Sequence, residues 1–425
     1  MEIKELTKQK ERAILVGVHT GSLDKLSDTT EETIAELARL ADTADAEVLA
    51  TMIQNKSQIE KATYIGEGKI EELKNVCESL DADLVIFDDE LSPIQIRNLE
   101  KMLDIRVIDR SMLILDIFAR HAESAEGKIQ VELAQLQYLL PRLTGMGTKM
   151  SRLGAGIGTR GPGETKLETD RRHIRTRISH LKAELSEVRK HRELIRNRRK
   201  KENKIVLALV GYTNAGKSTL LNALTGAGVL AENKLFATLD TTIRAKTLSD
   251  KREVLIADTV GFIRKLPHHL IEAFKSTLEE AVFADALLIV ADSSDPEVDT
   301  HIKVVTKLLS DIGAGEKPTL FAFNKVDELK EEINFAHLAE NAPFIEISAK
   351  SGVNIDLLLS EIENILPGKK KKVTLLIPYS EGSILSILHS NHSVLDEEYT
   401  ENGTRLTCML DAPTYAKFRD YIIEE

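Results

Sequence analysis

The chain has 425 residues, of which 42% are hydrophobic and 29% charged, and it has no tryptophan. This composition is ordinary for a globular protein, and the length suits two to four domains. The two cysteines, Cys77 and Cys408, have no ligand spacing, so we expect neither a structural disulfide nor a zinc site. The N-terminus has no signal-peptide pattern, and no apolar run approaches a membrane span. We therefore expect a cytoplasmic protein, with a peripheral association with membrane left open.

Charge is distributed unevenly along the chain. The net charge is −11, yet residues 142–204 hold 19 Lys/Arg against 7 Asp/Glu, a local +12 that leaves −23 for the rest. The densest part is the block 189–201. A basic block inside an acidic protein indicates contact with a polyanion, most often a nucleic-acid phosphate backbone. The alternative is a solvated helix face with a charged hinge before the next domain.

Residues 1–110 alternate strand and helix patterns and predict a small parallel α/β domain. The expected strands are 13–18, 47–52 and 84–88, and the expected helices are 31–43 and 92–103. Between two of these elements, the run Tyr-Ile-Gly-Glu-Gly-Lys at 64–69 resembles a phosphate loop. It is short and lacks a following Ser or Thr, so a turn is the first interpretation and a second nucleotide site the alternative.

From residue 111 to residue 203 the pattern becomes helical. Leucines recur at three- and four-residue steps from Leu133 to Leu143, and a polar helix with its own apolar seam is expected at 164–201. Two long helices joined by a loop predict an antiparallel arm. The intervening loop, 145–163, carries three Lys/Arg among seven glycines and could wrap RNA phosphates. The alternative interpretation of this loop is a disordered linker.

The pattern G-x-x-x-x-G-K-[ST] follows the expected strand 205–210 and precedes the expected helix 219–224. In this setting the backbone N–H groups of the loop cradle phosphate at a helix N-terminus. Lys217 would reach the outer phosphates, and the Ser218 hydroxyl would hold Mg²⁺. The residues expected to line the nucleotide here are Gly211, Tyr212, Thr213, Asn214, Ala215, Gly216, Lys217, Ser218 and Thr219.

A second motif follows the expected strand 254–257 and consists of Asp258, Thr259, Val260 and Gly261. The aspartate can support the Mg²⁺ shell, and the glycine lets a backbone N–H approach the γ-phosphate. A threonine between the two motifs must meet Mg²⁺, and we favour Thr238 over Thr242. The residue after Gly261 is Phe262, which has no group to orient the attacking water, so we expect slow hydrolysis that depends on a partner.

Guanine specificity is predicted by two further motifs, each placed at a strand end. Asn324, Lys325, Val326 and Asp327 follow the expected strand 320–323, and Ser348, Ala349 and Lys350 follow the expected strand 343–347. The Asp327 carboxylate would accept hydrogen bonds from N1–H and the N2 amine of guanine, which adenine lacks. A backbone N–H of the second motif would meet guanine O6. The substrate is therefore predicted to be GTP.

We expect the phosphate-loop domain to span 204–367, with a mostly parallel sheet covered by helices on both faces. A lysine-rich linker then leads to a small α+β domain at 373–425, which holds 3 Lys/Arg against 9 Asp/Glu. Such an acidic face suits a basic protein surface better than nucleic acid.

Several longer stretches of the chain are distinctive, namely 64–69, Asp109-Arg-Ser, 113–118, 126–136, Gly161-Pro-Gly-Glu-Thr through Arg172, Phe236-Ala-Thr-Leu-Asp240 and 266–270. In these stretches the chain resembles the HflX family of ribosome-associated GTPases. The resemblance implies a loop that contacts ribosomal RNA, GTP-dependent binding to the large subunit, and dissociation of stalled or idle ribosomes. It also implies an enzyme that works as a monomer when free.

By the same resemblance Ser218 and Thr238 hold Mg²⁺, and Phe236, Ala237, Thr238, Leu239 and Asp240 line the nucleotide. Lys217 and Gly261 would act on the transferred phosphate. Thr241 stands where the family usually has proline, which would loosen the first switch loop. Some family members bind ATP through the N-terminal domain, and no convincing site for it is visible in this sequence. The competing interpretation is a regulatory GTPase for a protein partner, with the basic arm as scaffold.

Overall fold

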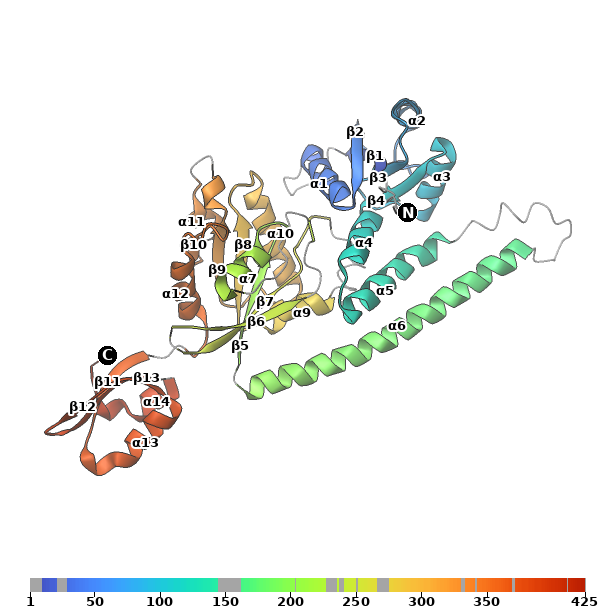
Figure 1. Ribbon diagram of the computed structural model, residues 1–425. Coiled ribbons are helices and arrows are strands. Elements are labelled where there is room, and N and C mark those ends of the chain that lie inside the picture. The colour runs from blue at the N-terminus through green and yellow to red at the C-terminus, as the bar shows by residue number, and fades with distance from the viewer. Residues whose placement is uncertain are drawn as a thin grey trace, which may run out of the picture.

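The computed structural model has three sheets and a long helical arm, in the order that the sequence predicts (Figure 1). It describes residues 10–20, 29–143, 162–202, 204–226, 235–236, 241–249, 251–265, 275–329, 333–340, 342–368, 371–410 and 412–424. The predicted fold class is confirmed: an α/β domain with an antiparallel helical arm, a phosphate-loop domain and a small α+β domain.

The N-terminal domain has a four-stranded parallel sheet in the order β2-β1-β3-β4. Its elements are β1 (Glu11–His19), α1 (Thr30–Thr43), β2 (Ala46–Asn55), α2 (Glu67–Leu80), β3 (Leu84–Phe87), α3 (Pro93–Leu103), β4 (Arg106–Asp109) and α4 (Arg110–His121). Helices α1 and α4 cover one face of the sheet, and α2 and α3 cover the other. Capping boxes at Thr29 and Ser92 fix where α1 and α3 begin.

The arm consists of α5 (Ala125–Arg142) and α6 (Pro162–Lys201), which lie side by side in Figure 1. Leu181 and Leu185 of α6 pack on Leu133 of α5 in a small apolar cluster. The expected seam between the two helices is therefore present. The glycine-rich loop that joins them lies outside the described residues.

The central domain has a six-stranded sheet in the order β10-β9-β8-β5-β7-β6, in which only β6 runs antiparallel to its neighbour. Its elements are β5 (Ile205–Gly211), α7 (Lys217–Thr225), β6 (Thr242–Thr247), β7 (Glu253–Asp258), α9 (Lys275–Phe283), β8 (Ala286–Asp292), α10 (Val298–Asp311), β9 (Thr319–Asn324), α11 (Phe335–Leu338), β10 (Phe344–Glu346) and α12 (Ile355–Ile365). Helices α7 and α12 pack on one face, and α9 and α10 on the other. The loops at the carboxyl ends of β5, β7 and β9 carry the predicted motifs, which is where such sheets bind ligands.

The C-terminal domain is an antiparallel sheet in the order β12-β13-β11-β14 with helices on it. Its elements are β11 (Lys371–Ile377), α13 (Gly382–Asn391), β12 (Ser393–Thr400), β13 (Gly403–Leu410), α14 (Ala412–Lys417) and β14 (Ile422–Glu424). The domain extends away from the central sheet in Figure 1.

One apolar core joins the N-terminal and central domains. It includes Leu37 and Phe118 from the first and Tyr212, Phe236 and Phe262 from the second. Burial of apolar side chains from both sides stabilises a fixed contact between the domains. Among the helices in the described segments, none is both long and apolar enough to cross a bilayer.

Candidate guanine-nucleotide site

The phosphate loop joins the carboxyl end of β5 to the first turn of α7, as the sequence predicts. Lys217 is buried, and its ammonium donates to the carbonyls of Tyr212 (2.7 Å) and Gly211 (3.1 Å). These bonds curl the loop around the lysine. Burial lowers the pKa of Lys217 to about 8, and the nearby Asp258 acts in the opposite direction. Phosphate oxygens at this position would supply the negative charge that favours the ammonium form.

Gly216 must be glycine for two reasons. Its φ is +92°, in the left-handed region, and a Cβ there would lie 2.3 Å from the Nδ2 of Asn324. The last loop glycine thus lets the base-recognition motif approach the backbone of the phosphate loop.

Ser218 and Asp258 meet at the edge of the loop. The Ser218 hydroxyl donates to Asp258 Oδ2 at 2.7 Å, and Asp258 is fully buried. In the described part of the chain no other side chain donates to its second oxygen, Oδ1. Burial raises the pKa of Asp258, although Lys217 and the Ser218 hydroxyl lower it. A hydroxyl beside a buried carboxylate is the oxygen donor set that suits a hard divalent cation.

The segment expected to supply the switch threonine is only partly described. Ala237, Thr238, Leu239 and Asp240 lie outside the described residues, so the choice of Thr238 stays a prediction. The alternative, Thr242, is the first residue of β6 and pairs with Asp258 across the ladder. Phe236 is described and is buried, with its ring edge-on to Phe118 of α4 at 4.7 Å. Its side chain therefore faces the N-terminal region.

The motif at 258–261 packs directly on the phosphate loop. A Cβ on Gly261 would lie 2.8 Å from the Cα of Thr213 and 3.0 Å from the Nζ of Lys217. Phe262 is buried, and it exchanges backbone hydrogen bonds with Gly211 (3.1 Å) and Thr213 (2.8 Å). The side chain of Phe262 packs beneath the loop, and its ring has no group that could hold water.

The base-recognition motifs meet through Asn324. Its buried amide donates to the carbonyl of Ala215 at 2.8 Å and accepts from the N–H of Ala349 at 2.9 Å. Asn324 therefore connects the phosphate loop, β9 and the Ser348–Lys350 loop. Lys325 has a positive φ of 67° and reaches Asp292 at 2.5 Å. This left-handed turn leaves Asp327 exposed on the short helix that follows.

The donor to guanine O6 stays a prediction. Ser348 donates its N–H to Val353, and Ala349 donates to Asn324. Among the other expected residues, Thr219 lies in the first turn of α7, Val326 follows β9, and Thr259 and Val260 follow β7. Lys350 follows Ala349 in the loop after β10.

The run at 64–69 forms a turn before α2. Gly66 is the N-cap of that helix, and its N–H donates to the Gln54 side chain at 3.1 Å. The Tyr64 hydroxyl donates to Asp89. These partners favour the turn interpretation over a second phosphate loop.

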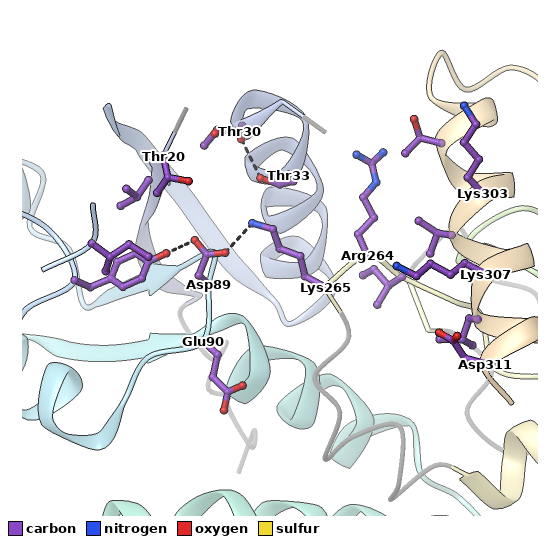
Figure 2. A pocket seen from close by; sticks show the side chains of 17 residues that line it. Thr20, Thr30, Thr33, Asp89, Glu90, Arg264, Lys265, Lys303, Lys307 and Asp311 are labelled. Carbon is purple, nitrogen blue, oxygen red and sulfur yellow. Dashed lines mark hydrogen bonds and ion pairs between the residues drawn. The ribbon is translucent and has the colours of Figure 1, made fainter. Parts of the chain in front are cut away.

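The sequence did not predict a polar cluster between the N-terminal and central domains. Arg110 is buried between Glu36 and Asp88, and Lys265 of the central domain ion-pairs with Asp88 at 2.7 Å. Figure 2 shows Lys265 beside Asp89 at the wall of an interdomain cleft of about 540 Å³. The run Asp109-Arg-Ser could be recognised as a sequence motif. The residues that contact Arg110 could not, because only the fold brings them together.

A neighbouring group of three potential metal ligands, Asp295, Glu297 and His301, already contains a cation. The Arg264 guanidinium bonds Glu297 and lies 3.3 Å from the Nε2 of His301. Arg39 also lies 3.6 Å from Asp295. This cluster therefore has the arrangement of an arginine-centred ion-pair network.

A phosphate loop, an aspartate-glycine motif at the next strand and an Asn-Lys-x-Asp motif, all on one sheet edge, define a P-loop GTPase. Family models match residues 31–119 (GTP-binding GTPase N-terminal), 121–199 (GTP-binding GTPase Middle Region) and 206–325 (50S ribosome-binding GTPase).

Similar proteins span nearly the whole chain. "GTPase HflX" of Caldanaerobacter subterraneus is 52% identical over 421 residues, covering 99% of this chain and 96% of that protein. "GTPase HflX" of Escherichia coli K12 is 42% identical over 396 residues, covering 93% and 92%. A crystal structure of a GTP-binding protein from Sulfolobus solfataricus in complex with GDP is 27% identical, covers 84% of this chain and 98% of that one, and has a TM-score of 0.45. The chain belongs to the HflX family of GTPases.

Proposed function

We propose that this GTPase binds the large ribosomal subunit in its GTP form and separates stalled or idle ribosomes into subunits. The observation that carries the proposal is the basic arm, within a family whose central-domain model is described as a 50S ribosome-binding GTPase. The expected residues at 211–219, 236–240, 258–261, 324–327 and 348–350 would line the nucleotide.

The chain's own residues support hydrolysis by positioning and charge. Lys217 would neutralise the outer phosphates, and the N–H of Gly261 would approach the γ-phosphate, since both lie against the loop. Asp327 is exposed, and its carboxylate would accept the guanine N1–H and N2 amine. Phe262 leaves the orientation of water to a partner.

The donor set described above fits Mg²⁺. Ser218 would coordinate the ion and Asp258 would hold its water shell, with Thr238 as the proposed third contributor. When bound, Mg²⁺ would neutralise charge on the β- and γ-phosphates.

The arm carries exposed cations in addition to the arginines that hold it to the rest of the molecule. Arg192, Arg196 and Arg199 pair with Glu126, Glu279 or Glu280 and belong to the packing of the molecule. Among the described residues of α6, the exposed cations are Arg172, Arg175, Arg177, Lys182, Arg189, Lys190, Arg198 and Lys201. Arg177 also pairs with Glu132 of α5, and Lys190 and Arg198 pair with glutamates of α6 itself. A row of cations on one long helix suits the phosphates of ribosomal RNA.

The acidic C-terminal domain would contact a basic ribosomal protein. Its edge strand β12 carries three consecutive acidic residues, Asp396, Glu397 and Glu398. Removing residues 373–425 should weaken subunit binding while nucleotide binding by the central domain is kept. Equal binding of the shortened chain to subunits would remove this contact from the proposal.

The test is sedimentation of 70S ribosomes with the protein and a non-hydrolysable GTP analogue. We expect the protein to travel with the large subunit and the 70S peak to shrink, with GDP as the comparison. Binding should weaken steeply with salt, because each neutralised phosphate releases counterions.

A loop deletion separates this function from that of a protein-partner switch. The docking of Arg196 and Arg199 on α9 is what favours the alternative, in which the arm is only scaffold. Removing residues 145–158, which lie outside the described residues, should keep GTP binding and abolish subunit separation. If the protein that lacks residues 145–158 splits ribosomes at the normal rate, the protein-partner function is favoured.

A further inference from the structure

A buried ionic cluster connects the N-terminal domain to the segment that follows Gly261. The Arg110 guanidinium bonds Glu36 and Asp88, and all three side chains are at most 2% exposed. The same guanidinium donates to the backbone carbonyl of Arg264 at 3.3 Å. The pKa of Arg110 stays above its usual value because Glu36 and Asp88 outweigh the effect of burial. The N-terminal domain therefore places the positively charged guanidinium of Arg110 next to the backbone of the central domain.

Tyr212, the second residue of the phosphate loop, enters this cluster through its side chain. Its hydroxyl donates to Glu36 and accepts from the N–H of Arg264 at 2.9 Å. Its ring stacks on His301 of α10 at 3.8 Å, with 14° between the planes. The hydroxyl therefore acts both as a donor and as an acceptor, and the ring cannot rotate without losing its stacking on His301.

The segment 261–265 is consequently fixed at both ends. Phe262 pairs with the phosphate loop by backbone hydrogen bonds, and Arg264 is held by Tyr212 and Arg110. Lys265 ion-pairs with Asp88 and Asp89 at 2.7 and 2.8 Å, the second of which is drawn in Figure 2. A segment of five residues with this many anchors has little freedom to leave the loop.

The fixed segment places Gly261 close to the phosphate-binding lysine. The contact is so close that a Cβ on Gly261 would lie 3.0 Å from the Lys217 Nζ. The backbone N–H of Gly261 and the ammonium of Lys217 would both contact the γ-phosphate, and the fold already holds these two residues next to each other.

We propose that Tyr212 is a positioning residue for the γ-phosphate: fixed by Glu36 of the N-terminal domain, its hydroxyl holds the segment 261–265 on the phosphate loop. This inference rests on the role given to Gly261 under the proposed function. Because a GDP site does not use Gly261, the contact favours GTP over GDP, and the N-terminal domain takes part in telling the two nucleotides apart.

The test compares affinities for GDP and for a non-hydrolysable GTP analogue with Mg²⁺. Tyr212→Phe removes the hydroxyl alone, and we expect the analogue-to-GDP affinity ratio to fall by about ten-fold, as for a lost hydrogen bond to a charged group. Tyr138→Phe is the matched control, because Tyr138 is also buried and donates to a carboxylate, that of Asp109 at 2.7 Å. The control should keep the wild-type ratio. A ratio unchanged in Tyr212→Phe, or lowered equally in both variants, would overturn the inference.

A second variant locates the effect in the contact between domains. Glu36→Gln keeps an acceptor but removes its charge, so the ratio should fall by a smaller factor than in Tyr212→Phe. Combined with Tyr212→Phe it should add little, because both changes act on the same hydrogen bond. Fully multiplicative effects would contradict a shared role. If the wild-type protein prefers the GTP analogue over GDP and both variants show the same affinity ratio, only this inference is rejected. If the wild-type protein binds the analogue and GDP equally well, the proposed role of Gly261 is rejected as well.

Discussion

Asn324 shows how one side chain can assemble a site from three loops. Its amide is buried and uses both of its polar atoms, one on the phosphate loop and one on the Ser348–Lys350 loop. The motif predicted to recognise guanine therefore also supports the phosphate loop mechanically. This coupling depends on the absence of a side chain at Gly216.

Replacing Gly216 should damage the site more than an ordinary glycine change. Gly216→Ala adds a Cβ 2.3 Å from Asn324 Nδ2, so we expect GTP affinity to fall by about ten-fold or more. The control is Gly226→Ala at the other end of α7, where φ is +68° and no described atom lies within 4 Å. Both variants should lose about 1 kcal/mol of unfolding free energy from backbone strain. Equal GTP affinity in the two variants, measured by titration of a fluorescent analogue, would contradict the role of the contact.

Base specificity should follow the exposed carboxylate of Asp327. Asp327→Asn presents an amide donor in place of an acceptor, so we expect GTP affinity to fall by about a hundred-fold or more and xanthosine triphosphate affinity to rise. Competition between the two nucleotides measures both changes in one titration. Unchanged GTP affinity would remove Asp327 from the guanine site.

The motif residues were predictable because each motif has a fixed order and a fixed place at a strand end. Tyr212 was predicted to line the nucleotide, but its hydroxyl partner could not be. Glu36 lies 176 positions away and in another domain, and a lone glutamate in an amphipathic helix normally faces water. Arg110 was recognised as part of a motif, yet its partners Glu36 and Asp88 lie in distant parts of the sequence and are brought to it only by the fold of the N-terminal domain.

At the scale of elements, the arginines of α6 lie in two different environments. Its C-terminal part is docked on α9, where Arg196 bonds Glu279 (3.0 Å) and Glu280 (3.1 Å) and lies 4.2 Å above the Phe283 ring. Two residues further on, Arg198 is 81% exposed and pairs with Glu202 of its own helix. A count of charges could not separate these arginines, because which face of the helix meets the central domain is a tertiary property.

Two single replacements should separate packing from binding. Arg196→Ala should lower the unfolding free energy by about 2 kcal/mol, because it leaves Glu280 buried without that partner. Arg198→Ala should leave stability unchanged and lower the salt slope of ribosome binding by about 1. Denaturant melts and sedimentation at several salt concentrations measure the two effects. If Arg198→Ala lowers stability and Arg196→Ala changes the salt slope, α6 presents another face to RNA.

Sequence patterns predicted the long helices and the buried strands, and missed elements with few apolar residues. Helix α2 buries only Ile70, Leu73 and Cys77, a weak stripe among charged residues. The edge strand β12 has acidic residues in succession, which break the alternation that marks a strand. Such elements form because neighbouring strands and helices complete their hydrogen bonds and cover their few apolar side chains.

For the whole molecule, the main feature that the sequence could not predict is the contact of Phe236 and Lys265 with the N-terminal half. Phe236, before β6, packs on Phe118 of α4, and Lys265, after β7, pairs with Asp88. Helix α4 also packs on α5 of the arm. Periodicity identifies apolar faces but not which faces meet, so the arrangement of domains was beyond prediction. The arm and the nucleotide site are thus connected through packed elements.

This connection leads to the prediction that the large subunit stimulates hydrolysis. Phe262 offers no polar group to the attacking water, and Phe236 packs on Phe118 of α4, the helix on which α5 of the arm also packs. The isolated protein should turn over GTP slowly, and large subunits should raise the rate by about ten-fold or more. Phosphate release under multiple-turnover conditions measures the rate, with small subunits as the control for RNA in general. The chain lacking residues 145–158 should keep the slow rate and lose the stimulation, because it keeps the nucleotide site and loses the expected RNA contact. Equal rates with and without large subunits would mean that the site is complete on its own, and that Phe262 does not create the need for a partner.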